Sequence, residues 1–226
     1  MSKHPCVLFV MNDITSSVES EFNQWYQGEH VRQRMGIPGF LSARRYRALG
    51  DSQAYMAIYH CTEVEVLEQP AYLEILVSPT ETTKKMMPHF RNMVRSACNE
   101  TWSAGSGLGG EVVVLRCAPI LKKEQQARDY LAKELDPLLA QANCLVRLAL
   151  WEASTSAGAA PSPEESRRGV PDERVQWVVF VETYDLGLCE KLLRQQSVLS
   201  AFAQNGLTVQ AQASYRLMST FEAVTE

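Results

Sequence analysis

The chain has 226 residues, of which 46% are hydrophobic and 21% charged, and its formal net charge is −4. This composition lacks the basic footprint of a nucleic-acid-binding protein, and no apolar run approaches the ~20 residues that a membrane-spanning helix needs. The N-terminus shows no signal-peptide pattern, so we expect a cytoplasmic protein with neither nucleic acid nor membrane as a partner. The six cysteines are scattered without a Cys-x-x-Cys pair, which indicates reduced core residues.

Residues 1–104 show the element order β-α-β-β-α-β, which is the ferredoxin-like pattern. The apolar run over 6–11 predicts a buried strand, and a helix capped near Thr15 should end at Gly36, because the proline that follows cannot continue it. The remaining elements predicted for this half are strands over 40–49, 55–61 and 90–100 and helices over 64–77 and 79–87.

The second half, residues 111–226, repeats this order after a glycine-rich linker at 105–110. A shift of 105 positions lays the strand at 7–10 on 112–115 and Glu29 on Glu134 without a gap. An insertion of 17 residues then falls within about 154–172, a stretch rich in Ser, Ala, Gly and Pro. We expect this insertion to form a flexible hairpin loop.

The helix that ends at Gly36 carries the candidate site. At about 100° per residue, Trp25 and Glu29 lie on one apolar stripe, with Tyr26 and His30 along its flank. A buried carboxylate needs a partner, a raised pKa or a polar cavity. Glu29 therefore indicates either an ion pair with an arginine of the next strand or a small-molecule site with an acid/base pair.

The residue types on this helix suit proton transfer. A histidine has an ordinary pKa near neutrality, so His30 is the side chain best placed to move a proton at pH 7, while Glu29 can orient or tune it. Tyr26 precedes His30 by one helical turn and can hydrogen-bond a substrate oxygen. In the second half, Leu135 stands at the position of His30. We therefore predict one working site, in the first half, with His30, Glu29 and Tyr26 as its catalytic residues.

The strand over 40–49 offers further substrate-binding residues. Arg44 and Tyr46 share one of its faces, whereas Arg45 and Arg47 share the other, so only one pair can face the helix. We expect Arg44 and Tyr46 to face the helix and to bind substrate together with Trp25. An inward arginine would either neutralise the helix carboxylate or bind an anionic substrate or enolate.

The sequence shows no metal or nucleotide motif. Glu29 and His30 are adjacent and point about 100° apart on a helix, which makes them poor joint ligands for one ion. The glycines at 105–110 precede a strand rather than a helix, so they do not form a phosphate-binding loop. No cofactor is expected, although haem stays open because a single axial histidine leaves no motif.

With both halves in view, Trp25, Tyr26, Glu29 and His30, followed by a Pro-Gly-Phe turn at 38–40, resemble the EthD-like group of the dimeric α+β barrel superfamily. The resemblance covers roughly residues 1–100 and is sharpest over 22–47. It implies that two four-stranded sheets pack face to face into a barrel, with helices outside and a pocket between the sheet and helices of each unit. Superfamily members include cofactor-independent isomerases, polyketide cyclases, quinone-forming monooxygenases and, in larger relatives, haem enzymes.

The physics of sheet burial agrees with this fold. A four-stranded sheet with helices on one face leaves a second face that must be covered, and the first strand is apolar on both sides. We therefore predict an α+β fold in which two ferredoxin-like repeats form one dimeric-type α+β barrel within the chain. This intrachain pseudo-dimer leaves open whether whole chains also form a homodimer.

Two hypotheses for function follow. The first is a cofactor-independent enzyme of the isomerase, lyase or oxygenase type that acts by proton transfer on a small apolar carbonyl, lactone or phenolic compound. The alternative is a non-catalytic small-molecule-binding or structural protein in which Glu29 is simply salt-bridged.

Overall fold

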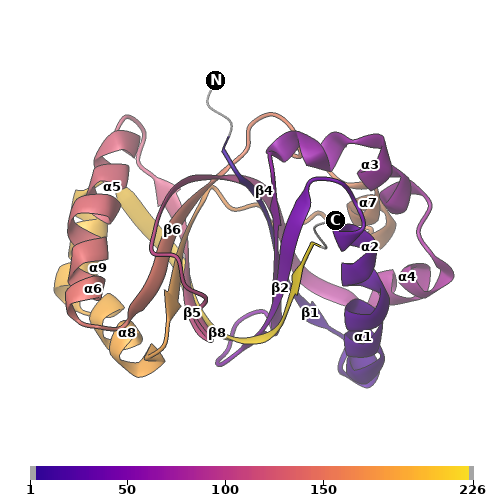
Figure 1. The fold of residues 1–226 in the computed structure, drawn as a ribbon, viewed down its shortest axis with the longest axis horizontal. Helices are drawn as coiled ribbons and strands as arrows, with labels where there is room; N and C mark the ends of the chain where they lie inside the picture. The colour runs from indigo at the N-terminus through magenta and orange to yellow at the C-terminus, as the bar shows by residue number, and fades with distance from the viewer. Residues whose placement is uncertain (1–3, 224–226) are drawn as a thin grey trace.

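The computed structural model describes residues 4–223, and its eight strands close into one antiparallel barrel (Figure 1). Around the barrel the order is β1-β3-β2-β8-β5-β7-β6-β4. The predicted α+β barrel within one chain is confirmed. The strands are β1 (Cys6–Ile14), β2 (Phe40–Ala48), β3 (Tyr55–Cys61), β4 (Phe90–Ala104), β5 (Glu111–Pro119), β6 (Leu145–Ala153), β7 (Trp177–Thr183) and β8 (Leu207–Glu222).

Two long strands close the barrel. β4 pairs with β1 through residues 90–99 and with β6 through 98–104. In the same way, β8 pairs with β5 through 207–216 and with β2 through 215–222. Backbone hydrogen bonds therefore join the two sheets along both seams, and no sheet edge among these eight strands is left unpaired.

The first helical segment has the same form in both halves. α1 (Glu19–Trp25) and α5 (Glu124–Tyr130) each lead into a π-helical turn, η2 (Tyr26–His30) and η5 (Leu131–Leu135). These turns lead into α2 (Val31–Met35) and α6 (Asp136–Gln141), so each pair of elements begins 105 residues apart. A π turn holds one more residue than an α turn, and it therefore rotates the side chains that follow relative to the 100° rule.

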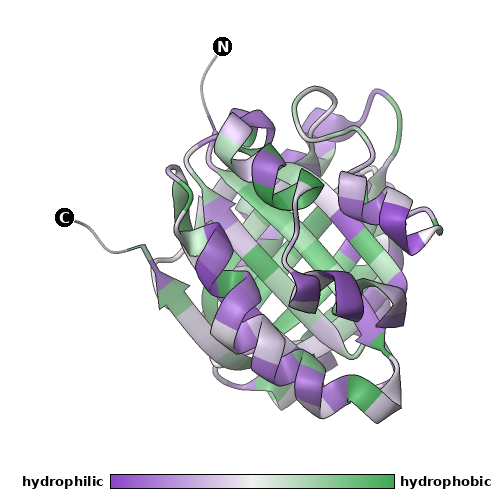
Figure 2. Ribbon diagram, turned by 90° about the vertical axis from the view of Figure 1, so that its right-hand side faces the viewer, coloured by the Kyte–Doolittle hydropathy of each residue, from purple (hydrophilic) through white to green (hydrophobic). Residues whose placement is uncertain are grey.

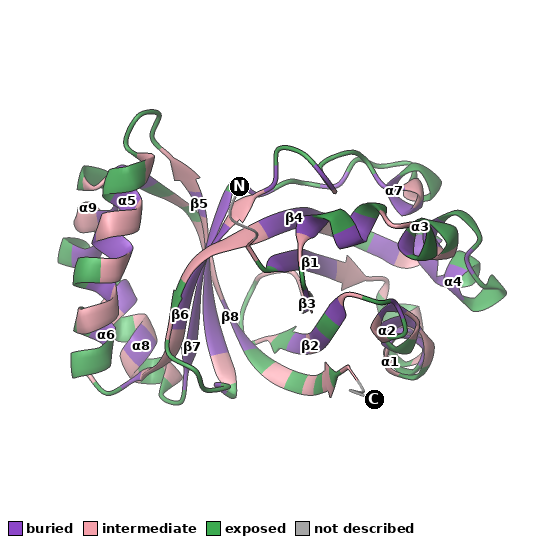
Figure 3. Ribbon diagram, turned by 45° about the horizontal axis from the view of Figure 1, so that its top comes forward, coloured by how far each residue is buried: buried purple, intermediate pink, exposed green. Residues whose placement is uncertain are grey.

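The apolar side chains form three layers. One lies between the first sheet and its helices, one fills the barrel, and one lies between the second sheet and its helices. Strand β1 serves two of these layers, with Leu8 facing the helices and Phe9 facing the barrel interior. Figure 2 shows the apolar sheet beneath helices with hydrophilic outer faces, and Figure 3 shows the same division as buried strands and exposed helix surfaces. The six cysteines are free and buried.

The remaining helices are divided unequally between the two sides. α3 (Pro70–Val77) and α4 (Glu81–Met86) cover the first sheet, whereas α8 (Leu186–Leu193) and α9 (Gln196–Gln204) cover the second. α7 (Pro163–Arg168) belongs to the second half by sequence but lies beside α3, among the helices of the first half (Figure 1). Within the described residues 4–223, no helix is long and apolar enough to cross a membrane.

The position of α7 corrects our expectation for the insertion at 154–172, which is more than an open hairpin loop. The Ser162 hydroxyl accepts a hydrogen bond from the Glu165 N–H at 3.2 Å, Pro163 begins the helix, and Gly169 ends it in the left-handed region at φ +72. Each of these is an ordinary helix-start or helix-stop signal. The Ser-Pro-Glu-Glu sequence could therefore have revealed the helix.

Candidate functional site

A cavity of about 30 Å³ lies between the first sheet and its helices, and we call it the His30 cavity. It has room for about two water molecules. Strands β1, β3 and β4 form its floor, and α7 helps to close it from the outside. The polar side chains that line it are Tyr26, His30, Arg34, Tyr59, Tyr72, Arg95, Glu164 and Arg168.

His30 is buried at the end of the π-helical turn, with 8% of its surface exposed. Its ring centroid lies 4.6 Å from those of Trp25 and Tyr26, and its Nδ1 has no hydrogen-bond partner within residues 4–223. Burial, reinforced by the positive charges of Arg34 and Arg45, holds the pKa of His30 well below its ordinary value. The imidazole is therefore neutral at pH 7 and can accept a proton.

Two buried tyrosines meet beside His30. The Tyr26 and Tyr59 hydroxyl oxygens are 3.0 Å apart, so one phenol donates a hydrogen bond to the other. Burial raises the pKa of both phenols, so both keep their protons at neutral pH. The phenol whose proton is not used in this pair can donate it to a substrate oxygen.

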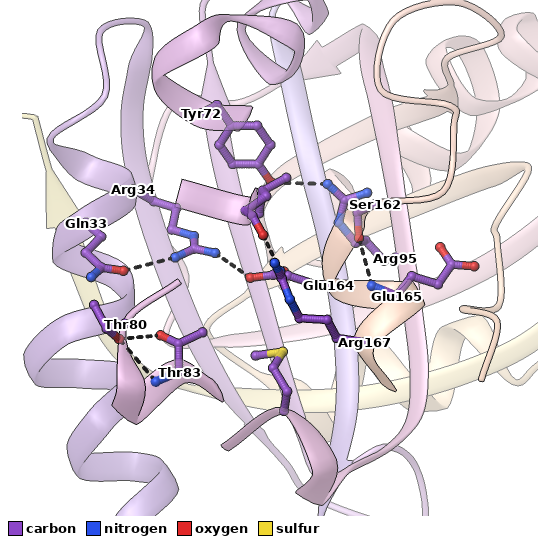
Figure 4. A network of polar contacts seen from close by, with 12 residues as sticks. Gln33, Arg34, Tyr72, Thr80, Thr83, Arg95, Ser162, Glu164, Glu165 and Arg167 are labelled. Atoms are coloured by element: carbon purple, nitrogen blue, oxygen red, sulfur yellow. Dashed lines mark hydrogen bonds and ion pairs between the residues drawn. The ribbon is translucent and has the colours of Figure 1, made fainter. Parts of the chain in front are cut away.

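Two buried guanidinium groups, those of Arg34 and Arg95, line the same cavity (Figure 4). Arg34 Nη2 donates to Glu164 Oε1 at 2.8 Å, and this ion pair joins α2 to α7. Arg95 Nη2 donates to the Tyr72 hydroxyl at 3.1 Å. Tyr26 and His30, which the sequence predicted, thus share their cavity with an arginine and a carboxylate that lie 130 residues apart in the chain.

Glu29 lies outside the His30 cavity, which corrects the stripe predicted from 100° per residue. The π-helical turn rotates Glu29 toward partial exposure and turns His30 toward the sheet. The Glu29 carboxylate accepts hydrogen bonds from the hydroxyls of Thr80 and Thr83, the latter at 3.4 Å. Its partners are therefore hydroxyl groups at the start of α4, not an arginine of β2.

The face predicted for Arg44 and Tyr46 is also wrong. Arg44 lies in the barrel interior, where its Nη1 is 3.1 Å from Glu182 Oε1, and Tyr46 is fully buried in the same interior layer. Arg45 faces the helix instead, with its guanidinium 4.2 Å from the centroid of the Tyr26 ring. Alternation along β2 separated the two faces correctly but could not decide which of them points outward.

Trp25 is buried behind His30 and does not line the His30 cavity. Its indole Nε1 has no hydrogen-bond partner among the described residues 4–223. Trp25 therefore packs its tilted ring against the imidazole of His30, whereas Tyr26 and Tyr59 line the cavity.

Sequence reasoning missed Arg34, Tyr59, Tyr72, Arg95 and Glu164. Arg34 had a local signal, because it follows His30 by four residues and so shares its helix face. The others come from β3, α3, β4 and α7, and no local spacing connects them to the helix. Only the folded chain brings these side chains together.

Two surface grooves adjoin the His30 cavity. One has a volume of about 540 Å³ and shares Phe90, Met93 and Arg168 with the cavity lining. The other has a volume of about 380 Å³ and shares Tyr72 and Arg95. The cavity is therefore separated from both grooves by a few side chains and by the segment that carries α7.

No protein-family model and no curated protein matches the chain, but solved structures match over almost its whole length. An anthrone oxidase-like protein aligns with a TM-score of 0.70 and 12% identity, over 99% of this chain and 95% of its own. A chlorite dismutase variant from Candidatus Nitrospira defluvii aligns at 0.59 and 12% identity, over 97% and 93%. A candidate monooxygenase from Fusobacterium nucleatum subsp. nucleatum aligns at 0.57 and 10% identity, over 98% and 96%. The chain has the dimeric α+β barrel fold. At such identities the likeness establishes the fold alone.

Whether a cofactor binds here has to be judged from the side chains around the His30 cavity. In the part of the chain that the structure describes, no three His, Cys, Asp or Glu side chains are grouped to hold a metal ion. The His30 imidazole is packed between the rings of Trp25 and Tyr26, with centroid distances of 4.6 Å, so both rings would have to move before a macrocycle could approach the histidine. The residues of this cavity therefore do not fit haem, and we derive no step through it.

Proposed function

We propose that the chain is an EthD-like α+β barrel enzyme with one working site, which moves a proton on a small, largely apolar phenolic or carbonyl compound. The observation that carries this proposal is His30, a buried neutral imidazole with an unpartnered Nδ1, set beside a tyrosine pair and two buried arginines. Groups with shifted pKa values that converge on one cavity are typical of catalytic sites.

The electrostatics of the cavity favour removal of a proton from carbon. A neutral His30 can accept a proton from a C–H group next to a carbonyl, which leaves an enolate, or from the O–H of a phenol, which leaves a phenolate. The negative charge that develops on the substrate oxygen is stabilised by Arg34, Arg95 and a tyrosine hydroxyl. Once the proton has moved, the negative charge of the substrate also stabilises the imidazolium of His30, which the neighbouring arginines would otherwise disfavour.

An oxygenase-type reaction fits this chemistry best, and the names of the neighbours, anthrone oxidase-like protein and candidate monooxygenase, support it. An activated CH₂ group gives a proton to His30, and the resulting carbanion is oxidised by dioxygen. The carbon loses its second hydrogen, one oxygen atom stays on carbon as a carbonyl, and the other leaves as water. In total, R₂CH₂ and O₂ give R₂C=O and H₂O, without a cofactor.

Anthrone is a direct probe of this function, because its CH₂ group is acidified by a ketone and two aromatic rings. We expect enzyme-dependent oxygen uptake on an oxygen electrode, with anthraquinone as the product. Replacing His30 by leucine, the residue that the second half carries at this position, should remove that uptake. If the His30→Leu variant consumed oxygen at the wild-type rate, His30 would not be the proton acceptor.

A non-catalytic binding protein is the second candidate. One observation favours it, because the Glu164 carboxylate already neutralises Arg34 and helps to fill the cavity. In that case anthrone and related compounds would bind near His30 without oxygen uptake. Crystals soaked with anthrone or with lactone fragments would show such binding as density beside Tyr26 and His30.

A further inference from the structure

The charges around the His30 cavity are unevenly distributed between the two halves of the chain. The cations Arg34, Arg45 and Arg95 all come from the first half and are buried. The carboxylates that act on Arg34 and Arg95 are Glu164 and Asp172, and both come from the insertion at 154–172. The insertion also supplies the cation Arg168, which lines the cavity and forms an ion pair with Asp172 at 2.6 Å, so Glu164 is the carboxylate of the insertion that pairs with a cation of the first half.

In the part of the chain that the structure describes, Arg45 and Arg95 have only neutral side-chain hydrogen-bond partners. Arg95 donates to the Tyr72 hydroxyl. Arg45 donates to the side-chain oxygens of Asn23 and Gln27, at 2.8 and 3.3 Å, and lies over the Tyr26 ring. Buried cations without a carboxylate partner are costly, so this part of the cavity favours a bound anion.

The helix that brings Glu164 is attached mainly through polar contacts. α7 has the sequence Pro-Glu-Glu-Ser-Arg-Arg and carries no aliphatic or aromatic side chain other than its first proline. Its side-chain hydrogen bonds with the first half run from Arg34 to Glu164, from Arg167 to the carbonyls of Leu76 and Val77, and from Arg168 to the Met87 sulfur at 3.9 Å. Water or a ligand can replace such contacts, whereas a buried apolar anchor would have to be exposed at a cost.

Backbone hydrogen bonds fix both ends of the insertion to β4, so α7 in its middle can move while the ends stay in place. The Ser154 N–H donates to the Ala97 carbonyl at 2.8 Å, and the Glu173 N–H donates to the Met93 carbonyl at 2.8 Å. Outward movement of α7 would join the His30 cavity to the grooves of about 540 and 380 Å³ beside it. A joined space of that size lies in the range of pockets that hold drug-sized ligands.

We propose that the site takes a small aromatic anion, a carboxylate or a phenolate, whose charged oxygen binds Arg34 and Arg95 in the place that Glu164 occupies, while α7 moves outward as a lid. This inference rests on the proposed function, because it names the charge class of the ligand for the same site. The Glu164 carboxylate occupies the position of the ligand's charged oxygen, and the two compete for Arg34.

Calorimetry with an unreactive pair of probes tests the inference without relying on turnover. The anion is 2-naphthoate, and the matched neutral compound is 2-naphthamide. Glu164→Gln removes the competing charge, so this variant should bind naphthoate about tenfold or more tightly than the wild type, as expected when a charge-assisted hydrogen bond becomes available. Its affinity for naphthamide should not change.

Two further variants separate charge competition from other effects. Glu134→Gln makes the same change of net charge at an exposed site of the second half, and its naphthoate affinity should equal that of the wild type. Arg34→Gln combined with Glu164→Gln leaves no unpaired charge at this contact but keeps Arg95, and it should remove the gain in naphthoate affinity that Glu164→Gln alone produces. Hydrogen exchange in residues 163–168 of the wild type should become faster when naphthoate is bound.

The outcomes distinguish this inference from the proposed function. Equal naphthoate affinity in the wild type and Glu164→Gln would overturn the inference, even if oxygen uptake with anthrone remained. Slower hydrogen exchange over 163–168 with naphthoate would overturn the movement of α7. A tenfold gain in naphthoate affinity without any turnover of anthrone would support the inference and count against the oxygenase function.

Discussion

The two halves of the barrel set the same helix against the same sheet, yet they line the interface with opposite chemistry. In the first half the interface carries phenols, an imidazole and guanidinium groups, whereas the second half carries only aliphatic side chains at the equivalent positions. All of these side chains are buried. The pairs are Tyr26 and Leu131, His30 and Leu135, Arg34 and Leu139, Arg45 and Leu150, and Tyr59 and Val181.

Strand pairing shows that these positions are equivalent. Tyr59 lies opposite Leu8 in the first sheet, and Val181 lies opposite Val113 in the second. Because the second half folds with aliphatic residues, the scaffold does not need the polar ones. Burial of unpaired polar or charged groups costs stability, so their presence in the first half points to a function. The insertion supports this view, because its helix α7 covers only the polar side.

The largest expected effect comes from making the first half like the second. His30→Leu should lower turnover of anthrone by about 10²- to 10⁴-fold, the usual loss when a general acid or base is removed. The melting temperature should stay the same or rise, since leucine fills the space and removes an unpartnered buried Nδ1. Oxygen uptake and thermal melting measure the two effects. A His30→Leu variant that melts at a lower temperature but keeps its specific activity would contradict the assignment.

The reverse side of the comparison predicts a loss of stability without a loss of chemistry. Leu135 is fully buried in the second layer. Leu135→Ala should lower the free energy of unfolding by about 2 to 5 kcal/mol, as for other large-to-small core substitutions. Turnover per folded molecule should be unchanged. Denaturant titration and activity at low temperature check both parts, and a selective loss of activity would place a working site in the second half.

The pH dependence of stability should report on the neutral His30, which the second half replaces by Leu135. Below pH 6.5, His30 is protonated in the unfolded chain but not in the folded chain. The free energy of unfolding therefore falls as the pH falls below this value, because the folded state has a lowered pKa for His30. His30→Leu should reduce this slope by about 1.4 kcal/mol per pH unit. His60, in the barrel interior, contributes a similar slope only down to its own pKa of about 4, where burial is the main cause of the lowered value. Denaturant titrations between pH 4.5 and 7 would show the difference, and an identical slope in both proteins would contradict a neutral His30.

The fold was predictable because its signals are local and repeated. The apolar run of β1, the proline that follows α2 and the glycines at 105–110 each fix an element or a boundary by short-range chemistry. The 105-residue offset then reproduces the elements of one half in the other up to β6. The lengths of β4 and β8 were less accessible, because their ends are set by pairing with the opposite half.

The site was predictable only in part. Tyr26 and His30 were found because they lie on one helix, and Arg34 could have been found from its spacing to His30. Glu164 could not, because the contact depends on where a distant insertion packs. Wherever the sequence offered two faces, as for Arg44 and Arg45, periodicity alone could not choose between them.

The smallest expected effect concerns Glu29, and it tests why the helical arithmetic failed. A π-helical turn between Tyr26 and His30 turns His30 toward the sheet and leaves Glu29 half-exposed, in contact with the hydroxyls of Thr80 and Thr83. Glutamine keeps an acceptor oxygen for those hydroxyls and removes only the charge. We expect Glu29→Gln to change the free energy of unfolding by less than about 0.5 kcal/mol, as surface substitutions usually do.

The matched control is Glu134→Gln, which alters the equivalent exposed carboxylate behind the second π-helical turn. Both variants should turn over anthrone at the wild-type rate and melt within a degree or two of each other, since about 1 kcal/mol shifts the melting temperature of a chain this long by about 2 to 4 °C. If Glu29→Gln lost activity as His30→Leu should, while Glu134→Gln did not, Glu29 would have to reach the cavity in the working enzyme. The helix would then have to lose its π-helical turn on binding substrate, because only an uninterrupted α-helix places Glu29 on the same stripe as Trp25.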